Sequence, residues 1–163
     1  QLGILIRGPE VLEQTKRVDT VVLDKTGTLT TGRMRVTAID PAAGVAEASL
    51  LGRAAAAESG SVHPVAAAII AAAGEAGVAA PEAEGFQAHD GAGVSAVVDG
   101  SAVAVGRAGW LAEAWSVEIP DAALMSITDR ESAGMTVVAV AIDGQFAGSL
   151  AIADAIRPEA AST

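Results

Sequence analysis

Residues 18–30 read V-D-T-V-V-L-D-K-T-G-T-L-T, and this stretch decides the fold. The apolar run at residues 21–23 is typical of a strand buried on both faces of a parallel sheet, and Asp24 follows directly at the carboxyl end of that strand. Ligands of open α/β sheets bind beyond the carboxyl ends of the strands. A carboxylate there can act as a nucleophile toward a phosphoryl group, although a bare D-x-T-G string is more often a simple turn.

In its complete form, the heptapeptide D-K-T-G-T-L-T at residues 24–30 resembles the phosphorylation signature of the P-type ATPases. The resemblance implies that Asp24 accepts the γ-phosphoryl group of ATP, with Mg²⁺ bridging the carboxylate and the phosphate. It also implies that Thr26 gives its backbone carbonyl to Mg²⁺ and that Lys25 and Thr28 flank the phosphate. Such a transfer needs acidic, cationic and metal groups together, because its catalysis is mainly positioning and charge neutralisation.

Length and composition limit the classes of protein that this chain can belong to. Its 163 residues are enough for one domain, or for one domain and a piece of another. Acidic residues outnumber basic ones by 20 to 10, which argues against nucleic acid as a partner, and the absence of cysteine excludes disulfides and thiolate metal sites. No apolar run reaches the roughly 18 to 20 residues of a membrane-spanning helix. Because the chain begins at Gln1 without a secretory signal, we interpret it as an excised piece of a longer protein.

The sequence S-V-H-P at residues 61–64 precedes an alanine-rich helix that we expect at residues 64–73, with Pro64 in its first turn. A lone histidine before a helix is usually a surface residue. The pattern S-x-H-P-x-A, however, resembles the S-E-H-P-L-A signature of heavy-metal P-type ATPases, with Val62 in place of the usual glutamate. This resemblance implies that His63 contacts the adenine of ATP and that Glu58, five residues earlier, recognises the edge of the base.

A second group of candidate nucleotide-binding residues consists of Gly91, Gly93, Gly106 and Arg107. By itself a G-x-G string is a weak signal, because glycine also relieves strain at a bulge or turn. The resemblance implies that the backbone of Gly91 and Gly93 approaches the nucleotide. The family usually has Gly-Asn where this chain has Gly106-Arg107, but an arginine can still meet a phosphate.

Hydrophobic patterning and turn residues predict the remaining elements. Asp99-Gly100 and Asp143-Gly144 indicate two hairpin turns. Trp110 and Trp115 are five residues apart, so we expect them on different faces of their helix. We expect strands at 32–39, 93–98, 101–105, 136–142 and 145–152, helices at 45–59, 64–73, 107–115 and 120–132, and a loop at 81–85.

Two further segments resemble heavy-metal P-type ATPases at the ends of the chain. Residues 3–13, G-I-L-I-R-G-P-E-V-L-E, resemble the segment that leads to the phosphorylated aspartate, and residues 153–160, A-D-A-I-R-P-E-A, resemble the return into the phosphorylation domain. The implied fold is α/β: residues 32–152 form a nucleotide-binding domain, an antiparallel sheet with flanking helices. It is inserted into a partial haloacid-dehalogenase-like phosphorylation domain formed by residues 1–31 and 153–163.

The resemblance implies the ATP-binding, phosphoryl-accepting cytosolic part of a heavy-metal exporter in a plasma or inner membrane, with Cu⁺ as the first choice of ion. Its partners are then ATP, the metal ion and the membrane and actuator domains of the same polypeptide, and this piece alone is expected only to bind nucleotide. Pumps for zinc or other divalent metals share these motifs. A soluble haloacid-dehalogenase phosphatase normally has a second aspartate where this chain has Thr26, and a nucleotide-sensing domain would not need D-K-T-G-T-L-T.

Overall fold

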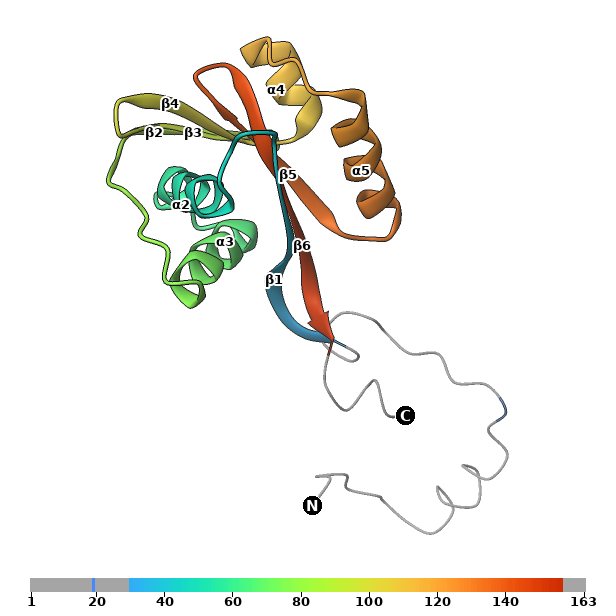
Figure 1. Cartoon of the computed structure of the whole chain (residues 1–163). Coiled ribbons are helices and arrows are strands. Elements are labelled where there is room, and N and C mark those ends of the chain that lie inside the picture. Colours follow the sequence, from blue (N-terminus) through green and yellow to red (C-terminus); the bar gives the residue numbers. More distant parts are fainter. Residues whose placement is uncertain (1–18, 20–29, 157–163) are drawn as a thin grey trace.

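The computed structural model describes residue 19 and residues 30–156, and every helix and strand below lies in the second range. Within it, six strands form one antiparallel sheet in the order β1-β6-β5-β4-β3-β2 (Figure 1). The predicted antiparallel sheet with flanking helices is confirmed. The elements are β1 (Thr30–Pro41), α2 (Glu47–Glu58), α3 (Pro64–Glu75), β2 (Ala83–His89), β3 (Gly93–Val98), β4 (Ser101–Gly106), α4 (Ala108–Trp115), α5 (Asp121–Ser132), β5 (Thr136–Ile142) and β6 (Gln145–Ile156).

The two faces of the sheet carry different helices. Figure 1 shows α2 and α3 on one face, and α4 and α5 on the other. Successive side chains of a strand point to opposite faces of the sheet, so each strand contributes to a core on either face. On β5, Val138 and Val140 pack in the core with α2 and α3, whereas Ala139 and Ala141 pack with Leu111 of α4. Residues on α2 and α4 that act on one site must therefore act from opposite sides of the sheet.

Helix α2 approaches its neighbours closely because its inner side is built from small residues. Ala54 and Ala57 are completely buried. A Cβ atom at Gly52 would lie 2.9 Å from the backbone oxygen of Ala79, in the segment that follows α3. Small residues in α2 thus allow it to lie close to its neighbours, since larger side chains at these positions would be overpacked.

Both predicted hairpins are present. Asp99 and Gly100 have φ angles of 50° and 75°, and Asp143 and Gly144 have φ angles of 50° and 76°. Two consecutive residues with positive φ favour the tight turn whose twist matches paired strands, and Asp-Gly tolerates that conformation. The second turn is also anchored by its side chain, because Asp143 Oδ1 accepts a hydrogen bond of 2.8 Å from the backbone N–H of Ala102.

The predicted loop at residues 81–85 is wrong from residue 83 onward, because β2 already begins at Ala83. Ala83 and Glu84 pair with Val98 and Val97 of β3, and the register then shifts before Gln87. Gly85 lies at this shift with φ of 63°. A glycine with positive φ is typical of a β-bulge, so the residue that suggested a loop instead interrupts the strand pairing without ending the strand.

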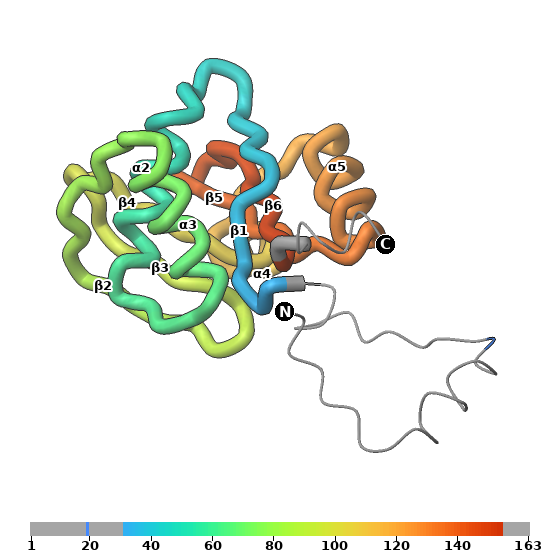
Figure 2. Tube along the Cα trace, turned by 90° about the horizontal axis from the view of Figure 1, so that it is seen from below, coloured from blue at the N-terminus to red at the C-terminus, as the bar shows by residue number. Residues whose placement is uncertain are grey.

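The first and last strands along the chain, β1 and β6, lie side by side, as Figures 1 and 2 show. Thr30 at the start of β1 is the register partner of Ile156 at the end of β6. The described chain therefore enters and leaves the sheet at one place, which suits a domain inserted in a host. The limits at residues 32 and 152 stay a prediction, since most of the flanking residues lie outside the described part. None of the helices in residues 30–156 has the length and apolar character needed to cross a membrane.

Candidate functional site

The connection between α2 and α3 carries a buried carboxyl group. Glu58 is the last residue of α2, and only 5% of it is exposed. Burial disfavours the charged form and raises the pKa of the Glu58 carboxyl to about 7, while a hydrogen bond with the side chain of Ser61 acts in the opposite direction. Near neutral pH this side chain can therefore be present both as an acid, which donates a hydrogen bond, and as a carboxylate, which only accepts them.

An aromatic side chain from β2 covers the same connection. A Cβ atom at Gly60 would come 2.7 Å from Cγ of Phe86, so the Phe86 ring lies directly on the backbone of Gly60. The backbone N–H of Ser61 donates to the carbonyl of Glu58 at 2.9 Å. These contacts fix the connection against the sheet, and glycine at position 60 is required because any side chain would displace the ring.

His63 is the N-cap residue of α3, and its ring takes part in the cap. Nδ1 accepts a hydrogen bond of 3.2 Å from the backbone N–H of Val65, and the backbone N–H of His63 donates to Ser61 Oγ at 3.3 Å. Because Nδ1 is the acceptor, the neutral ring carries its proton on Nε2. His63 is exposed, so the cap holds the ring in one orientation while leaving it accessible to a ligand.

The second group of predicted residues lies where β2, β3 and β4 end. Gly91 is exposed and has φ of 67°, and a Cβ atom there would meet no atom within 4 Å. The turn is closed by a hydrogen bond of 2.9 Å from Ala92 N to His89 O. Gly93 and Gly106 are register partners on β3 and β4. The backbone N–H of Arg107 donates to Ala92 O at 2.9 Å, which joins this turn to the start of α4.

Gly93 and Gly106 are required by the packing of the protein itself. A Cβ atom at Gly93 would overlap the backbone oxygen of Val105, and one at Gly106 would overlap the backbone oxygen of Ala92. The predicted approach of a nucleotide to the Gly93 backbone stays a prediction, because on the side of the two strands where a Cβ atom would stand, the space is filled by protein. Only Gly91 leaves open space where a side chain would stand.

The structure therefore divides the predicted residues between two clusters. We call the first the base cluster (Glu58, Ser61 and His63) and the second the turn cluster (Gly91, Gly93, Gly106 and Arg107). Phe86 of β2 contacts Gly60, which lies in the same connection as the base cluster, and β2 then leads on to the turn that carries Gly91. Asp24, Lys25, Thr26 and Thr28 lie outside the described residues, so the Mg²⁺ site expected at Asp24 and Thr26 does too.

Sequence reasoning missed the roles of Ser61 and Phe86. Ser61 stands inside the quoted S-x-H-P pattern, and its hydroxyl position two residues before a histidine N-cap was the available signal. Phe86 is 26 positions from Gly60, and its contact follows from the pairing of β2 with the sheet, which no local pattern records.

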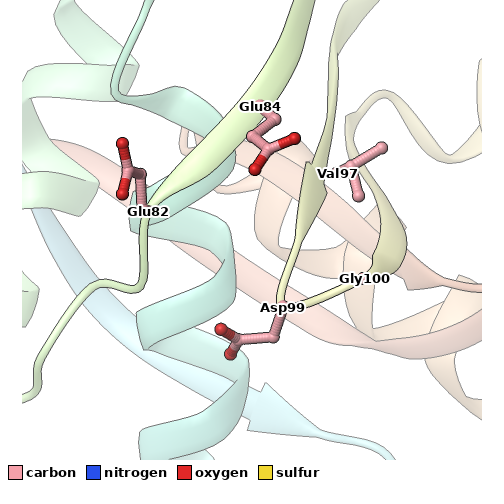
Figure 3. A pocket seen from close by; sticks show the side chains of 5 residues that line it. All are labelled: Glu82, Glu84, Val97, Asp99 and Gly100. Carbon is pink, nitrogen blue, oxygen red and sulfur yellow. The ribbon is translucent and has the colours of Figure 1, made fainter.

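A pocket of about 260 Å³ at the edge of the sheet is a poor site for phosphate. Figure 3 shows that the side chains of Glu82, Glu84 and Asp99 border it, together with Val97 and Gly100. Three carboxylates would repel a phosphate group unless cations neutralised them. Among the residues that the structure describes, no group of three or more His, Cys, Asp or Glu side chains is arranged to hold a metal ion.

The chain matches a known family model over nearly its whole length. Residues 18–163 match the model of the haloacid dehalogenase-like hydrolases. Among curated proteins, the probable copper-exporting P-type ATPase V of Mycobacterium tuberculosis is 48% identical over 161 residues, covering 99% of this chain and 21% of that protein. The zinc/cadmium/lead-transporting P-type ATPase of Escherichia coli is 44% identical over 160 residues, with coverage of 98% and 21%. The chain thus spans about one fifth of these relatives.

Solved structures agree with the sequence relatives. A zinc-transporting PIB-type ATPase in the E2.Pi state matches with a TM-score of 0.82 and 44% identity, over 97% of this chain and 25% of the other. The N-domain of a copper-transporting P-type ATPase matches with a TM-score of 0.61 and 30% identity, over 73% of this chain and 99% of that domain. The predicted resemblance is confirmed: the chain belongs to the haloacid dehalogenase-like hydrolase family, and its relatives there are heavy-metal P-type ATPases.

Proposed function

We propose that this chain is the ATP-binding and phosphoryl-accepting cytosolic part of an ATP-driven heavy-metal exporter in a plasma or inner membrane. The names of its relatives support heavy-metal transport. We propose Cu⁺ as the ion, which the identity of 48% with a probable copper exporter supports. A pump for zinc or another divalent metal is the second candidate, because the E. coli relative is 44% identical. The membrane and actuator domains of the same polypeptide would be its partners.

The base cluster is the observation that carries this proposal. A buried carboxyl beside an exposed, oriented imidazole suits the adenine of ATP, which presents an N–H donor at N6 and an acceptor at N1. The Glu58 side chain as an acid would accept from N6 and donate to N1, and its pKa of about 7 makes this form available near neutral pH. The His63 ring offers a face for stacking and a proton on Nε2.

The turn cluster would meet the phosphates. Backbone N–H groups at a glycine turn and an arginine are the groups that commonly hold phosphate. Gly91 is exposed and leaves its surroundings open, and Arg107 is exposed beside it in the structure. Since the chain carries a net charge of −10, such local donors have to oppose the overall charge of the protein.

Asp24 would accept the γ-phosphoryl group, and Asp24 and Thr26 would hold Mg²⁺ together with ligands from a segment beyond this chain. Bound Mg²⁺ would supply charge neutralisation between the carboxylate and the phosphate. This part of the proposal is supported by the sequence D-K-T-G-T-L-T and by the family match that begins at residue 18. Thr26 at the place of the second aspartate favours phosphoryl acceptance over a phosphatase.

Titration of the isotope-labelled chain with ATP tests the proposal. We expect the largest amide shifts at residues 58–63 and 91–93, because the base and the phosphates would meet these backbones. Cytidine triphosphate is the matched control: it carries the same phosphates without adenine, so it should shift residues 91–93 and leave Glu58 and His63 nearly unchanged. Largest ATP-induced shifts around Glu82 and Asp99 would show that the site is assigned to the wrong place.

His63 can be tested with two variants that separate its helix cap from its base contact. In His63→Asn the amide oxygen can still accept from Val65 N–H, so the melting temperature should stay close to that of the unaltered chain. His63→Ala removes the cap and should cost about 1 kcal/mol of stability. Both variants lose the ring, so both should bind ATP about tenfold more weakly, the scale of one base contact.

The comparison is decisive because the two variants differ only in the cap. Calorimetric titration of each folded variant with ATP gives the dissociation constants, and thermal unfolding without ligand gives the stabilities. If His63→Asn bound ATP as tightly as the unaltered chain, His63 would be a helix cap with no part in nucleotide binding.

A further inference from the structure

A tryptophan on the face of the sheet opposite α2 packs against the turn cluster. Trp110 lies on α4, and a Cβ atom added at Gly93 would come 2.7 Å from its Cζ3 atom. A Cβ atom added at Gly106 would come 2.8 Å from its Cε3 atom. Because Gly93 and Gly106 are register partners, the indole rests on the backbones of β3 and β4 at the same point.

A histidine on β2 extends this contact to the third strand. The ring centroid of His89 lies 4.9 Å from that of Trp110, with 41° between the ring planes. His89 Nε2 lies 2.9 Å from the hydroxyl of Ser95, whose side chain is buried. His89 and Gly93 are register partners, so the two rings lie next to each other at the start of β3, the strand that leaves the Gly91 turn.

Backbone hydrogen bonds connect these rings to the turn itself. His89 accepts from Ala92 N, and Ala92 in turn accepts from Arg107 N, each at 2.9 Å. Arg107 is the N-cap residue of α4 and stands three residues before Trp110. A movement of Trp110 or His89 would therefore be transmitted directly to the turn at residues 91–93 and to the backbone of Arg107.

We propose that Trp110 and His89 are positioning residues of the nucleotide site, which hold residues 91–93 and the Gly106-Arg107 backbone in the arrangement that receives the phosphates. This inference rests on the proposed function. Both rings act from the α4 face through the backbone and need no contact with the nucleotide. A turn that is already fixed loses little freedom on binding, whereas a loosened turn has to be ordered by the ligand, and this lowers the affinity.

Trp115 provides a matched control on the same helix. Its ring meets that of Trp110 edge to face at 6.2 Å, and it packs in the same small core with Leu111 and Val117. It is not among the atoms nearest to Gly93 or Gly106. Trp110→Ala and Trp115→Ala should both lower the melting temperature, but only Trp110→Ala should change the turn cluster.

The experiment measures ATP binding to the folded variants below their unfolding transitions, by calorimetry and amide shifts. We expect Trp110→Ala to weaken ATP binding about tenfold and Trp110→Phe to stay within about threefold, because a phenyl ring keeps part of the contact with both glycines. Without nucleotide, the Arg107 amide should exchange faster in Trp110→Ala. Should that variant fail to fold, His89→Ala carries the test, with an expected weakening of about threefold and faster exchange of the Ala92 amide.

The possible results separate this inference from the function on which it rests. If the unaltered chain did not bind ATP, the proposed function would be overturned and the positioning role with it. If the unaltered chain bound ATP but Trp110→Ala bound equally well, only the positioning role would be wrong. It would also be wrong if Trp115→Ala weakened binding as much as Trp110→Ala, because the loss would then reflect general loosening of α4.

Discussion

Asp24→Asn should remove the phosphorylated intermediate completely from a full-length transporter that carries this chain. An amide cannot attack the γ-phosphoryl group of ATP as a carboxylate does. Because the nucleophile itself is missing, we expect no residual phosphorylation of the variant. The transporter is incubated with γ-labelled ATP and quenched in acid. We expect label that is stable in acid and released by hydroxylamine in the unaltered protein, and none in Asp24→Asn.

Asp19→Asn is the matched control, because Asp19 is an exposed carboxylate five positions away. That variant should be labelled normally. The 163-residue chain alone should be labelled hardly at all, since the further Mg²⁺ ligands proposed to lie beyond this chain would be missing and a carboxylate and a phosphate repel without cations. Equal labelling of Asp24→Asn and the unaltered transporter would exclude Asp24 as the acceptor.

Local chemistry made much of the fold predictable. Asp-Gly at residues 99–100 and 143–144 accepts the positive φ angles of a tight hairpin, so these turns and the strands beside them followed from the sequence. Pro64 likewise indicated the start of α3. These predictions succeeded because each depends on the conformational preference of one or two residues and on nothing distant in the chain.

The errors arose where distant contacts decide the conformation. Gly85 suggested a loop, but the pairing of β2 with β3 makes it a bulge. The expected placement of Trp110 and Trp115, about 140° apart around an ideal helix, is not contradicted, but the spacing did not indicate that their rings meet edge to face at 6.2 Å. Tertiary packing of large rings is not recorded in the spacing of their residues.

The candidate site likewise combines features that local sequence indicated with features that only the structure shows. The motif S-x-H-P identified His63, but its cap on Val65 was not expected, because histidine is not among the usual N-cap residues. Gly93 and Gly106 stay predicted nucleotide-binding residues, and the structure adds a packing role against Trp110 that the sequence did not indicate. A family motif thus proposes candidate residues, and the structure shows which packing and capping contacts hold them.

ATP binding should weaken as the pH rises above 7, through the ionisation of Glu58. If adenine pairs with the carboxylic acid, which accepts from N6 and donates to N1, then loss of the proton removes the donor. With a pKa of about 7, the dissociation constant should rise about thirtyfold between about pH 6 and about pH 8.5. Glu58→Gln offers a neutral amide with the same donor and acceptor pair, so its profile over this range should be much flatter.

The same pair of proteins corrects for the ionisation of ATP itself, because both bind the same nucleotide at each pH. Isothermal titration at fixed Mg²⁺ supplies the dissociation constants, and their ratio isolates the Glu58 carboxyl. Parallel profiles for the unaltered chain and the Glu58→Gln variant, or affinity that rises with pH only in the unaltered chain, would show that the carboxylic acid is not the form that meets the base.

Stability without nucleotide gives an independent test of the same carboxyl. The folded pKa of about 7 lies above the ordinary 4.5, so the folded state binds more protons than the unfolded state between these values. The free energy of unfolding contributed by Glu58 is therefore fully present below about pH 4.5, falls as the pH rises toward 7, and stays low above it. Glu58→Gln removes this loss, so it should be more stable than the unaltered chain at about pH 8 by up to about 3 kcal/mol, with the difference shrinking toward about pH 5. A difference that does not change with pH would mean that burial does not raise the pKa of Glu58, and the pH dependence of ATP binding would then need another source.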